Sequence, residues 1–235
     1  MTVADVPVVT LAGWHSTLPH NVLGGSLFAV ESAARGQAAV ALFENGCGIH
    51  ADIMIDGDGV ITGLSSDELR AARAAAPDGA IDAHIMFLGD GFLPAADTAV
   101  RAAIVNVVSV DVVRLAVSRA IIDRFGPELE ELRARGIRVW IDVAPGDDGS
   151  SIDRERVDGA LVMFIEPGST DAADPSNLDK LAMLSSFLPV GADGGIAADL
   201  CNACLDAGAS YVVSGRALLR ATSPVTSTEK EEIQL

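Results

Sequence analysis

The chain has 235 residues, of which 49% are hydrophobic and 4% aromatic, and its formal net charge is −17. Such a charge argues against nucleic acid and anionic membrane surfaces as partners, because both require clustered Lys and Arg. No apolar run approaches the roughly 20 residues that cross a bilayer, and no signal segment opens the chain. Three cysteines are too few for a disulfide framework, so we expect a soluble protein of the reducing cytoplasm.

Short runs rich in Val, Ile and Ala recur along the chain and predict eight buried strands. They lie at Pro7–Gly13, Gly48–Ile55, Ile81–Phe87, Asp111–Ser118, Ile137–Ala144, Ala160–Pro167, Leu188–Ile196 and Ser210–Gly215. Helical patterns between them include Asn21–Arg35, Ser66–Ala75, Glu128–Arg135, Asn177–Ser186 and Ala198–Ala207. This repeated strand–helix order predicts an α/β fold that closes as a TIM (β/α)8 barrel.

The fourth strand has two candidate positions. Ile104–Val110 is as rich in β-branched residues as Asp111–Ser118. We assign the strand to Asp111–Ser118, because a Val-Asp or Ile-Asp pair also accompanies other predicted strands. This choice leaves Ala95–Val110 as a helix of poor intrinsic propensity.

The sequence predicts a single barrel domain over residues 1–221 and a polar tail over 222–235. After Arg220 the chain is too polar for a full eighth helix, so we expect only a turn or two. An incomplete ring of helices would expose apolar barrel surface, which predicts a homo-oligomer in which another subunit covers it.

Four ionisable residues fall within predicted strands: His50, Asp52, His84 and Asp193. Side chains two apart on a strand point to the same face, so His50 and Asp52 can both face the barrel axis. His84 lies on the next strand, and Asp193 lies nearly opposite around a ring of eight. Two nitrogen and two oxygen ligands suit Zn, Fe(II), Mn or Co.

The alternative for any single histidine is a hydrogen-bonded core residue. For the four residues together, burying two unpaired carboxylates would cost several kcal/mol, which favours a metal site.

Several short motifs resemble the ribulose-phosphate 3-epimerase family over the span from Thr10 to about Leu219. The family pattern has His-x-Asp-x-Met, His-Leu-Met, Val-Met-x-x-x-Pro-Gly and Asp-Gly-Gly. The matching stretches are HADIM (50–54), HIM (84–86), VMFIEPG (162–168), DGGI (193–196) and VVSGRAL (212–218).

The resemblance implies that His50, Asp52, His84 and Asp193 bind the metal and that Asp52 and Asp193 also act as acid and base. The implied enzyme is an isomerase that inverts the carbon next to the ketone of a ketose phosphate through an enediolate. The chemistry agrees, because such an inversion needs one proton carrier on each face of the carbon. The metal would stabilise the charge that develops on the substrate oxygens.

The resemblance also implies substrate-binding residues. Met54, Met86 and Met163 correspond to methionines that line the family's pocket, and Ser16 resembles its N-terminal strand serine. Without the resemblance, the methionines would be read as ordinary core residues.

The chain departs from the family pattern in the residues that bind phosphate. The loop EPGSTDAADPSN (166–177) lacks the glycine pair that wraps a phosphate, and it is acidic instead. Gly194, Gly195 and Gly215 stay available for close approach of an anion. Arg216 stands where the family has a serine; it either binds an anionic group or pairs with a nearby surface acid.

Two alternatives remain open. The first is an epimerase or isomerase for a non-phosphorylated or carboxylated sugar, which the altered loop favours. The second is a sugar-binding barrel without catalysis, against which the retained carboxylates and histidines count.

Overall fold

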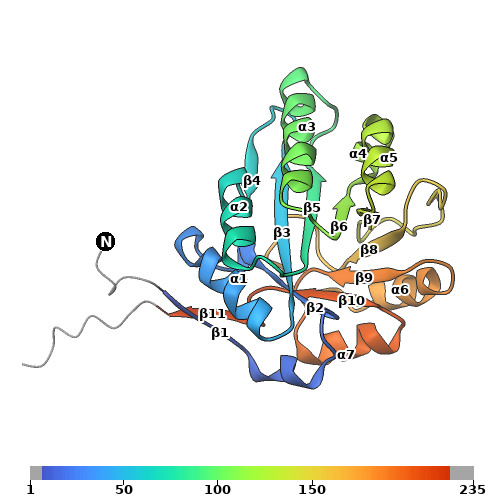
Figure 1. Ribbon diagram of the computed structural model, residues 1–235. Coiled ribbons are helices and arrows are strands. Elements are labelled where there is room, and N and C mark those ends of the chain that lie inside the picture. Colours follow the sequence, from blue (N-terminus) through green and yellow to red (C-terminus); the bar gives the residue numbers. More distant parts are fainter. Residues whose placement is uncertain (1–6, 223–235) are drawn as a thin grey trace, which may run out of the picture.

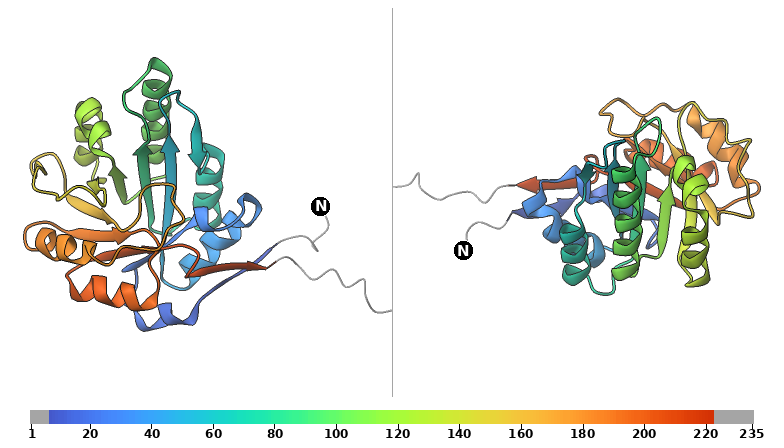
Figure 2. Two further views of the ribbon diagram at one scale, coloured as in Figure 1. Left: turned by 180° about the vertical axis from the view of Figure 1, so that it is seen from behind. Right: turned by 90° about the horizontal axis from the view of Figure 1, so that it is seen from above.

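Eight parallel strands close into a barrel in the computed structural model, which describes residues 7–222 (Figures 1 and 2). In chain order the barrel strands are β2 (Leu23–Ser26), β3 (Gly48–Ile55), β5 (Ile81–Phe87), β6 (Arg114–Val117), β7 (Arg138–Val143), β8 (Gly159–Met163), β9 (Val190–Asp193) and β10 (Tyr211–Ser214). Around the ring they follow the order β2, β10, β9, β8, β7, β6, β5, β3, and pairing of β2 with β3 closes it. The predicted (β/α)8 fold is confirmed.

Helices cover the outside of this barrel. They are α1 (Arg35–Glu44), α2 (Ser66–Ala75), α3 (Pro94–Ser109), α4 (Arg119–Arg124), α5 (Gly126–Ala134), α6 (Asn177–Ser185) and α7 (Ala198–Asp206). The assignment of a helix before the fourth predicted strand is confirmed by α3 and β6. Within the described residues, the stretches that follow β7 and β10 contain no α-helix, so the helical ring is incomplete.

The core divides into an outer and an inner part because side chains alternate along each strand. The larger cluster joins the outward residues of the strands to the helices, as Ile49 and Ile53 of β3 show. A smaller cluster around Trp140, Leu161 and Tyr211 fills part of the barrel interior. The residues of β3 that alternate with Ile49 and Ile53, among them His50 and Asp52, therefore face the barrel interior.

The prediction for the first barrel strand is wrong. The segment Pro7–Gly13 contains β1 (Val8–Leu11), which pairs antiparallel with β11 (Leu219–Thr222) as a separate two-stranded ribbon. The first barrel strand is β2, inside the segment Asn21–Arg35 that the sequence predicted to be helical. The rest of that segment includes the short 3₁₀ helices η3 (Leu27–Ala29) and η4 (Ser32–Ala34). A further 3₁₀ helix, η2 (Gly13–Thr17), lies between β1 and β2.

Tertiary packing explains why β2 has the unpromising sequence LGGS. A Cβ atom at Gly24 would lie 1.9 Å from the Tyr211 hydroxyl, and one at Gly25 would lie 2.3 Å from a methyl of Leu42. Neighbouring elements therefore occupy the space that side chains would need. Glycine normally weakens a strand, so local propensity pointed away from the right answer.

The C-terminal prediction also needs correction. A turn or two of helix was expected after Arg220, but the described residues there, Ala221 and Thr222, belong to strand β11, which starts at Leu219. Beyond Thr222, the predicted polar tail lies outside the described residues. In the ribbon views, β1 and β11 extend away from the barrel side by side (Figures 1 and 2).

A hairpin extends one barrel strand, because β4 (Ile61–Gly63) folds back antiparallel on the end of β3. Across residues 7–222, no helix is long and apolar enough to cross a membrane.

Candidate active site in the barrel

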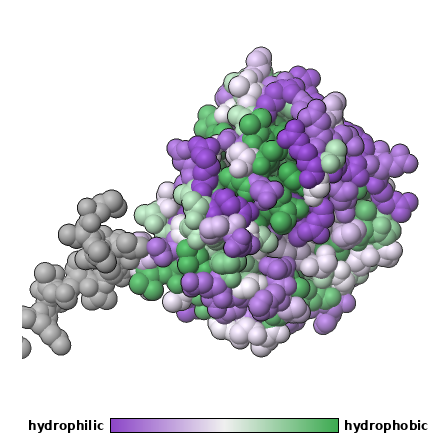
Figure 3. All heavy atoms as spheres, viewed as in Figure 1, coloured by the Kyte–Doolittle hydropathy of each residue, from purple (hydrophilic) through white to green (hydrophobic). Residues whose placement is uncertain are grey.

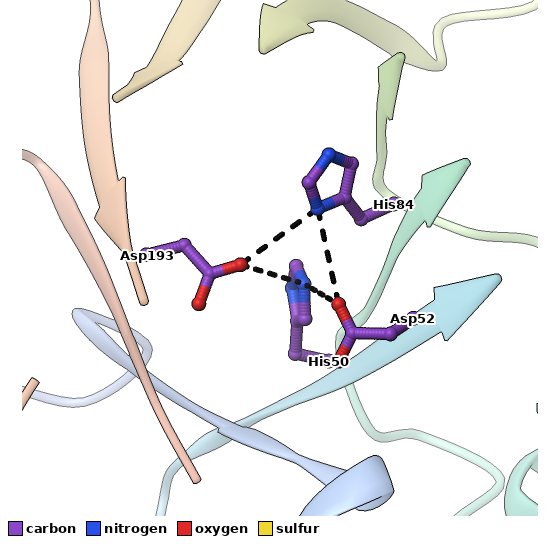
Figure 4. Close-up of side chains that lie close together, drawn as sticks. All are labelled: His50, Asp52, His84 and Asp193. Atoms are coloured by element: carbon purple, nitrogen blue, oxygen red, sulfur yellow. Dashed lines mark ion pairs between the residues drawn. The ribbon is translucent and has the colours of Figure 1, made fainter. Parts of the chain in front are cut away.

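The side chains of His50, Asp52, His84 and Asp193 meet inside the barrel (Figure 4). One candidate ligand atom from each lies within 4.8 Å of the others. His50 Nε2 is 3.3 Å from Asp52 Oδ1 and 3.6 Å from Asp193 Oδ2. His84 Nδ1 is 3.8 Å and 3.7 Å from the same two oxygens. The structure thus brings together all four predicted residues.

Strand register produces this arrangement. β3 and β5 are parallel, with His50 opposite Asp82 and Asp52 opposite His84. Asp193 is the last residue of β9, three places from β3 around the ring. The two carboxylates consequently approach the shared space from facing sides, as Figure 4 shows.

Two polar partners that the sequence analysis missed hold these side chains. The Ser26 hydroxyl donates a hydrogen bond of 2.6 Å to Asp52 Oδ2, which leaves Oδ1 facing the cluster. His84 Nε2 lies 3.0 Å from Asp142 Oδ2 on β7. Asp142 lies two residues after the inward-facing Trp140, so alternation along β7 was a signal that could have found it.

Burial and neighbouring charges shift the pKa values of His50, Asp52 and His84. Burial alone would lower the pKa of His84, but the hydrogen bond with Asp142 and the negative charges of Asp142 and Asp193 outweigh it and raise the pKa to about 10. The pKa of His50 is also raised, since the charges of Asp52 and Asp193 outweigh its burial. Burial would raise the pKa of Asp52, yet the two histidines lower it to about 2. The carboxylates therefore favour a cation in the space between them.

The atoms facing this space fit a divalent transition metal. Both ring nitrogens of His50 and Nδ1 of His84 are buried and have no hydrogen-bond partner within the described chain. Buried polar atoms rarely stay unpaired, so an additional partner is expected there. Imidazole nitrogens and carboxylate oxygens are ligands that zinc, iron, manganese and cobalt accept.

A cavity of about 420 Å³ opens above the cluster and reaches Asp52 and Asp193. Seven of the predicted substrate-binding residues line it: Met54, Met86, Met163, Gly194, Gly195, Gly215 and Arg216. The eighth, Ser16, does not. It is exposed in η2, where its hydroxyl donates to the Gly13 carbonyl, because the segment assigned to the first strand lies outside the barrel. Ser26 lines the cavity instead.

Charges of both signs lie at the cavity mouth. Arg216 is the one Lys or Arg among the lining residues, while Glu166 and Asp171 add carboxylates from the loop after β8. The Asp171 carboxylate accepts a hydrogen bond from the Ser169 hydroxyl, which ties it within this loop. An anionic group would thus meet one cation and two acids.

The glycines after β9 have a packing role as well. Gly194 has φ +106°, and a Cβ atom there would lie 2.9 Å from the backbone nitrogen of Ile165. The β8 loop packs directly against this turn. Glycine at 194 is therefore required whether or not an anion binds beside it.

Below the cluster, the barrel holds a buried cation. Arg114 lies between the rings of Trp140 and Tyr211, with its guanidinium carbon 4.1 Å and 4.0 Å from the ring centroids. Its Nε is 3.2 Å from Asp82 Oδ1, so this cation is neutralised locally. It does not offset the carboxylates above.

The cysteines take no part in the site. Cys201 and Cys204 are buried in α7, and burial raises the pKa of these thiols to about 11 and about 12. Both side chains therefore pack in the core.

No family model matches the sequence. Among solved structures, the chain is similar to the tryptophan synthase A-subunit of the hyperthermophile Pyrococcus furiosus, with a TM-score of 0.61 and 14% identity over 84% of this chain and 87% of that chain. A chain from the tryptophan synthase a2b2 complex of the same organism gives a TM-score of 0.60 and 16% identity over 84% and 88%. At these identities, the similarity concerns the barrel fold alone.

Proposed function

We propose that the protein is a metal-dependent epimerase that inverts the carbon next to the ketone of a ketose or ketose phosphate. One observation carries this proposal: two histidines and two carboxylates converge at the floor of an open cavity, with the carboxylates on facing sides. The resemblance to ribulose-phosphate 3-epimerases points to the same reaction.

His50, Asp52, His84 and Asp193 would hold the metal, His50 through Nε2 and His84 through Nδ1. A bound divalent ion supplies Lewis-acid stabilisation of the charge that develops on the substrate oxygens, an effect worth several kcal/mol.

Asp52 and Asp193 would move the protons. Each carboxylate faces the cavity from a different strand, so a substrate carbon between them has one carboxylate on either side. One takes the proton from the carbon next to the ketone, and the other returns a proton to the opposite face. Ser26 holds Asp52 in place through Oδ2.

The experiment measures metal content and proton exchange together. After reconstitution with Zn, Mn, Fe(II) or Co, we expect about one metal ion per chain, and His50→Ala or His84→Ala should lose it. In deuterated water, the unaltered protein should place deuterium at the inverted carbon. Asp52→Asn and Asp193→Asn should each slow inversion at least about a hundredfold, while either can still exchange the substrate proton from one face.

Asp179→Asn is the matched control, because Asp179 is an exposed aspartate on α6 away from the cavity. Failure to bind any of these metals, or inversion at full rate by a metal-loaded Asn variant, would contradict the proposal. Binding of ketoses without deuterium exchange would instead support a sugar-binding barrel without catalysis.

A second candidate keeps this chemistry on a sugar that carries no phosphate. Glu166 and Asp171 at the cavity mouth favour it, because carboxylates repel a phosphate. Rates with matched phosphorylated and free ketoses distinguish the two candidates.

We also propose that the protein forms a homo-oligomer. The incomplete helical ring supports this, since apolar surface left uncovered by helices is commonly buried against another subunit.

A further inference from the structure

Asp142 is the one polar partner of a cluster histidine that comes from outside the four candidate ligands, within the described residues. Its Oδ2 lies 3.0 Å from His84 Nε2, and His84 is fully buried. Asp142 belongs to β7, two strands away from His84 on β5. The contact therefore crosses the intervening strand β6.

The residue between them makes this contact feasible. On β6, Ala116 is paired with His84 on one side and with Trp140 on the other. A single methyl at this inward position leaves room for the imidazole and the carboxylate to meet. A larger side chain on β6 would separate them.

We propose that Asp142 is a positioning residue for the metal centre: it accepts a hydrogen bond from Nε2–H of His84 and thereby presents Nδ1 as the metal ligand. This inference rests on the proposed metal site. Asp142 itself contributes no ligand.

The reason lies in which atoms can donate and which can accept a hydrogen bond. An ionised carboxylate only accepts, so it fixes the proton of a neutral imidazole on the nitrogen that it faces. The lone pair then lies on Nδ1, the atom 3.7–3.8 Å from the carboxylate oxygens of Asp193 and Asp52. A carboxylate partner also makes the imidazole a stronger ligand, and loss of such partners typically weakens metal binding about 10–100-fold.

His50 provides an internal comparison. Among residues 7–222, neither of its ring nitrogens has a hydrogen-bond partner, so no described residue equivalent to Asp142 fixes its orientation. A change at Asp142 should therefore affect His84 and leave His50 unaltered.

The first test measures zinc affinity by chelator competition. Asp142→Ala should raise the Kd for Zn²⁺ about 10–100-fold. Asp142→Asn should restore part of the affinity, because an amide oxygen still accepts the Nε2 hydrogen bond but carries no charge. Asp179→Asn is the control and should bind zinc like the unaltered protein.

The second test reads the ring nitrogens directly. In zinc-loaded protein labelled with ¹⁵N-histidine, NMR should show Nδ1 of His84 bound and Nε2 protonated. In Asp142→Ala these two signals should change or broaden, while those of His50 keep their positions. A general loss of structure would alter both histidines together, so it is distinguishable from loss of positioning.

Two failures have different meanings. If the unaltered protein binds no transition metal, the proposed function fails and this inference fails with it. If the unaltered protein binds zinc and both Asp142 variants bind it equally well with the same His84 nitrogen, only the role of Asp142 is overturned.

Discussion

At the residue scale, the balance of charges around the cluster of His50, Asp52, His84 and Asp193 constrains what can bind there. Asp52, Asp142 and Asp193 contribute three carboxylates, while the guanidinium of Arg114 is already paired with Asp82 below. A divalent cation would offset two of the three negative charges. A substrate with its own negative charge must then be met by a cation at the mouth, where Arg216 lies.

Exchange of Arg216 for alanine tests the charge of the substrate. A charge-assisted contact is worth roughly 1.5–3 kcal/mol, so Arg216→Ala should raise KM about ten- to a hundredfold for a ketose phosphate. A neutral ketose has no anionic group to lose, and its KM should hardly change. Steady-state kinetics with both substrates measure the difference.

Arg220→Ala is the matched control, because Arg220 is exposed on β11 and does not line the cavity. Unchanged KM for the best ketose phosphate in Arg216→Ala would show that Arg216 does not bind the anionic group, and would favour the sugar without phosphate.

The candidate ligands could be predicted from the sequence because alternation within a strand places His50 and Asp52 on one face. Ser26 and Asp142 act across strands, and their roles depend on which strands are neighbours. Ser16 was assigned by resemblance to a strand that lies outside the barrel. Residue spacing within a strand predicts which side chains share a face, but it does not predict which strands are neighbours and which side chains meet between them.

At the scale of elements, a carboxylate links α1 to the start of α2. Glu68 forms a capping box with Ser65, and its Oε1 accepts hydrogen bonds from Arg35 and the Ser32 hydroxyl. Burial would raise the pKa of Glu68, but the hydrogen bonds from Ser32 and Ser65 and the charge of Arg35 lower it to about 2.

This shift predicts a stability that depends on pH. The folded state favours ionised Glu68, so the contribution is present above the unfolded pKa of about 4.5 and is lost as pH falls toward 2. Glu68→Gln should lower the free energy of unfolding by about 1–2 kcal/mol at pH 7 and by less at pH 3. Urea unfolding at both pH values measures this.

Asp67→Asn is the control, since it removes an exposed carboxylate from the same helical turn. An equal loss of unfolding free energy at pH 7 and pH 3 for Glu68→Gln would contradict an ionic contribution.

The elements that the sequence predicted well have strong local signals. Ser66–Ala75 matches α2, whose capping box and apolar spacing are both local. β2 was missed because its two glycines reflect the neighbouring Tyr211 and Leu42, which local propensity cannot register. The short α4 lay outside the predicted helices for a different reason: at six residues it gives too little periodicity.

At the scale of the molecule, several large apolar side chains are in contact with solvent. Val60, Leu93 and Val105 are 57%, 52% and 67% exposed. Figure 3 shows hydrophobic residues gathered near the middle of the viewed face, with hydrophilic residues around them. Such a surface is typical of subunit contacts.

We therefore expect self-association at micromolar concentration. Sedimentation equilibrium should give a mass that is a whole multiple of the chain mass, independent of substrate. A monomer mass across this concentration range would contradict the oligomer and leave the catalytic proposal unaffected.

The β1–β11 ribbon brings the two ends of the described chain together outside the ring of barrel strands. Val8 is paired with Thr222, which places these two positions about 5 Å apart. A short linker replacing residues 1–6 and 223–235 could join them without disturbing a barrel strand. New ends could then open in the helix-free stretch 144–158, between β7 and β8. The barrel would thus tolerate circular permutation, with the same eight strands closing from a different starting point.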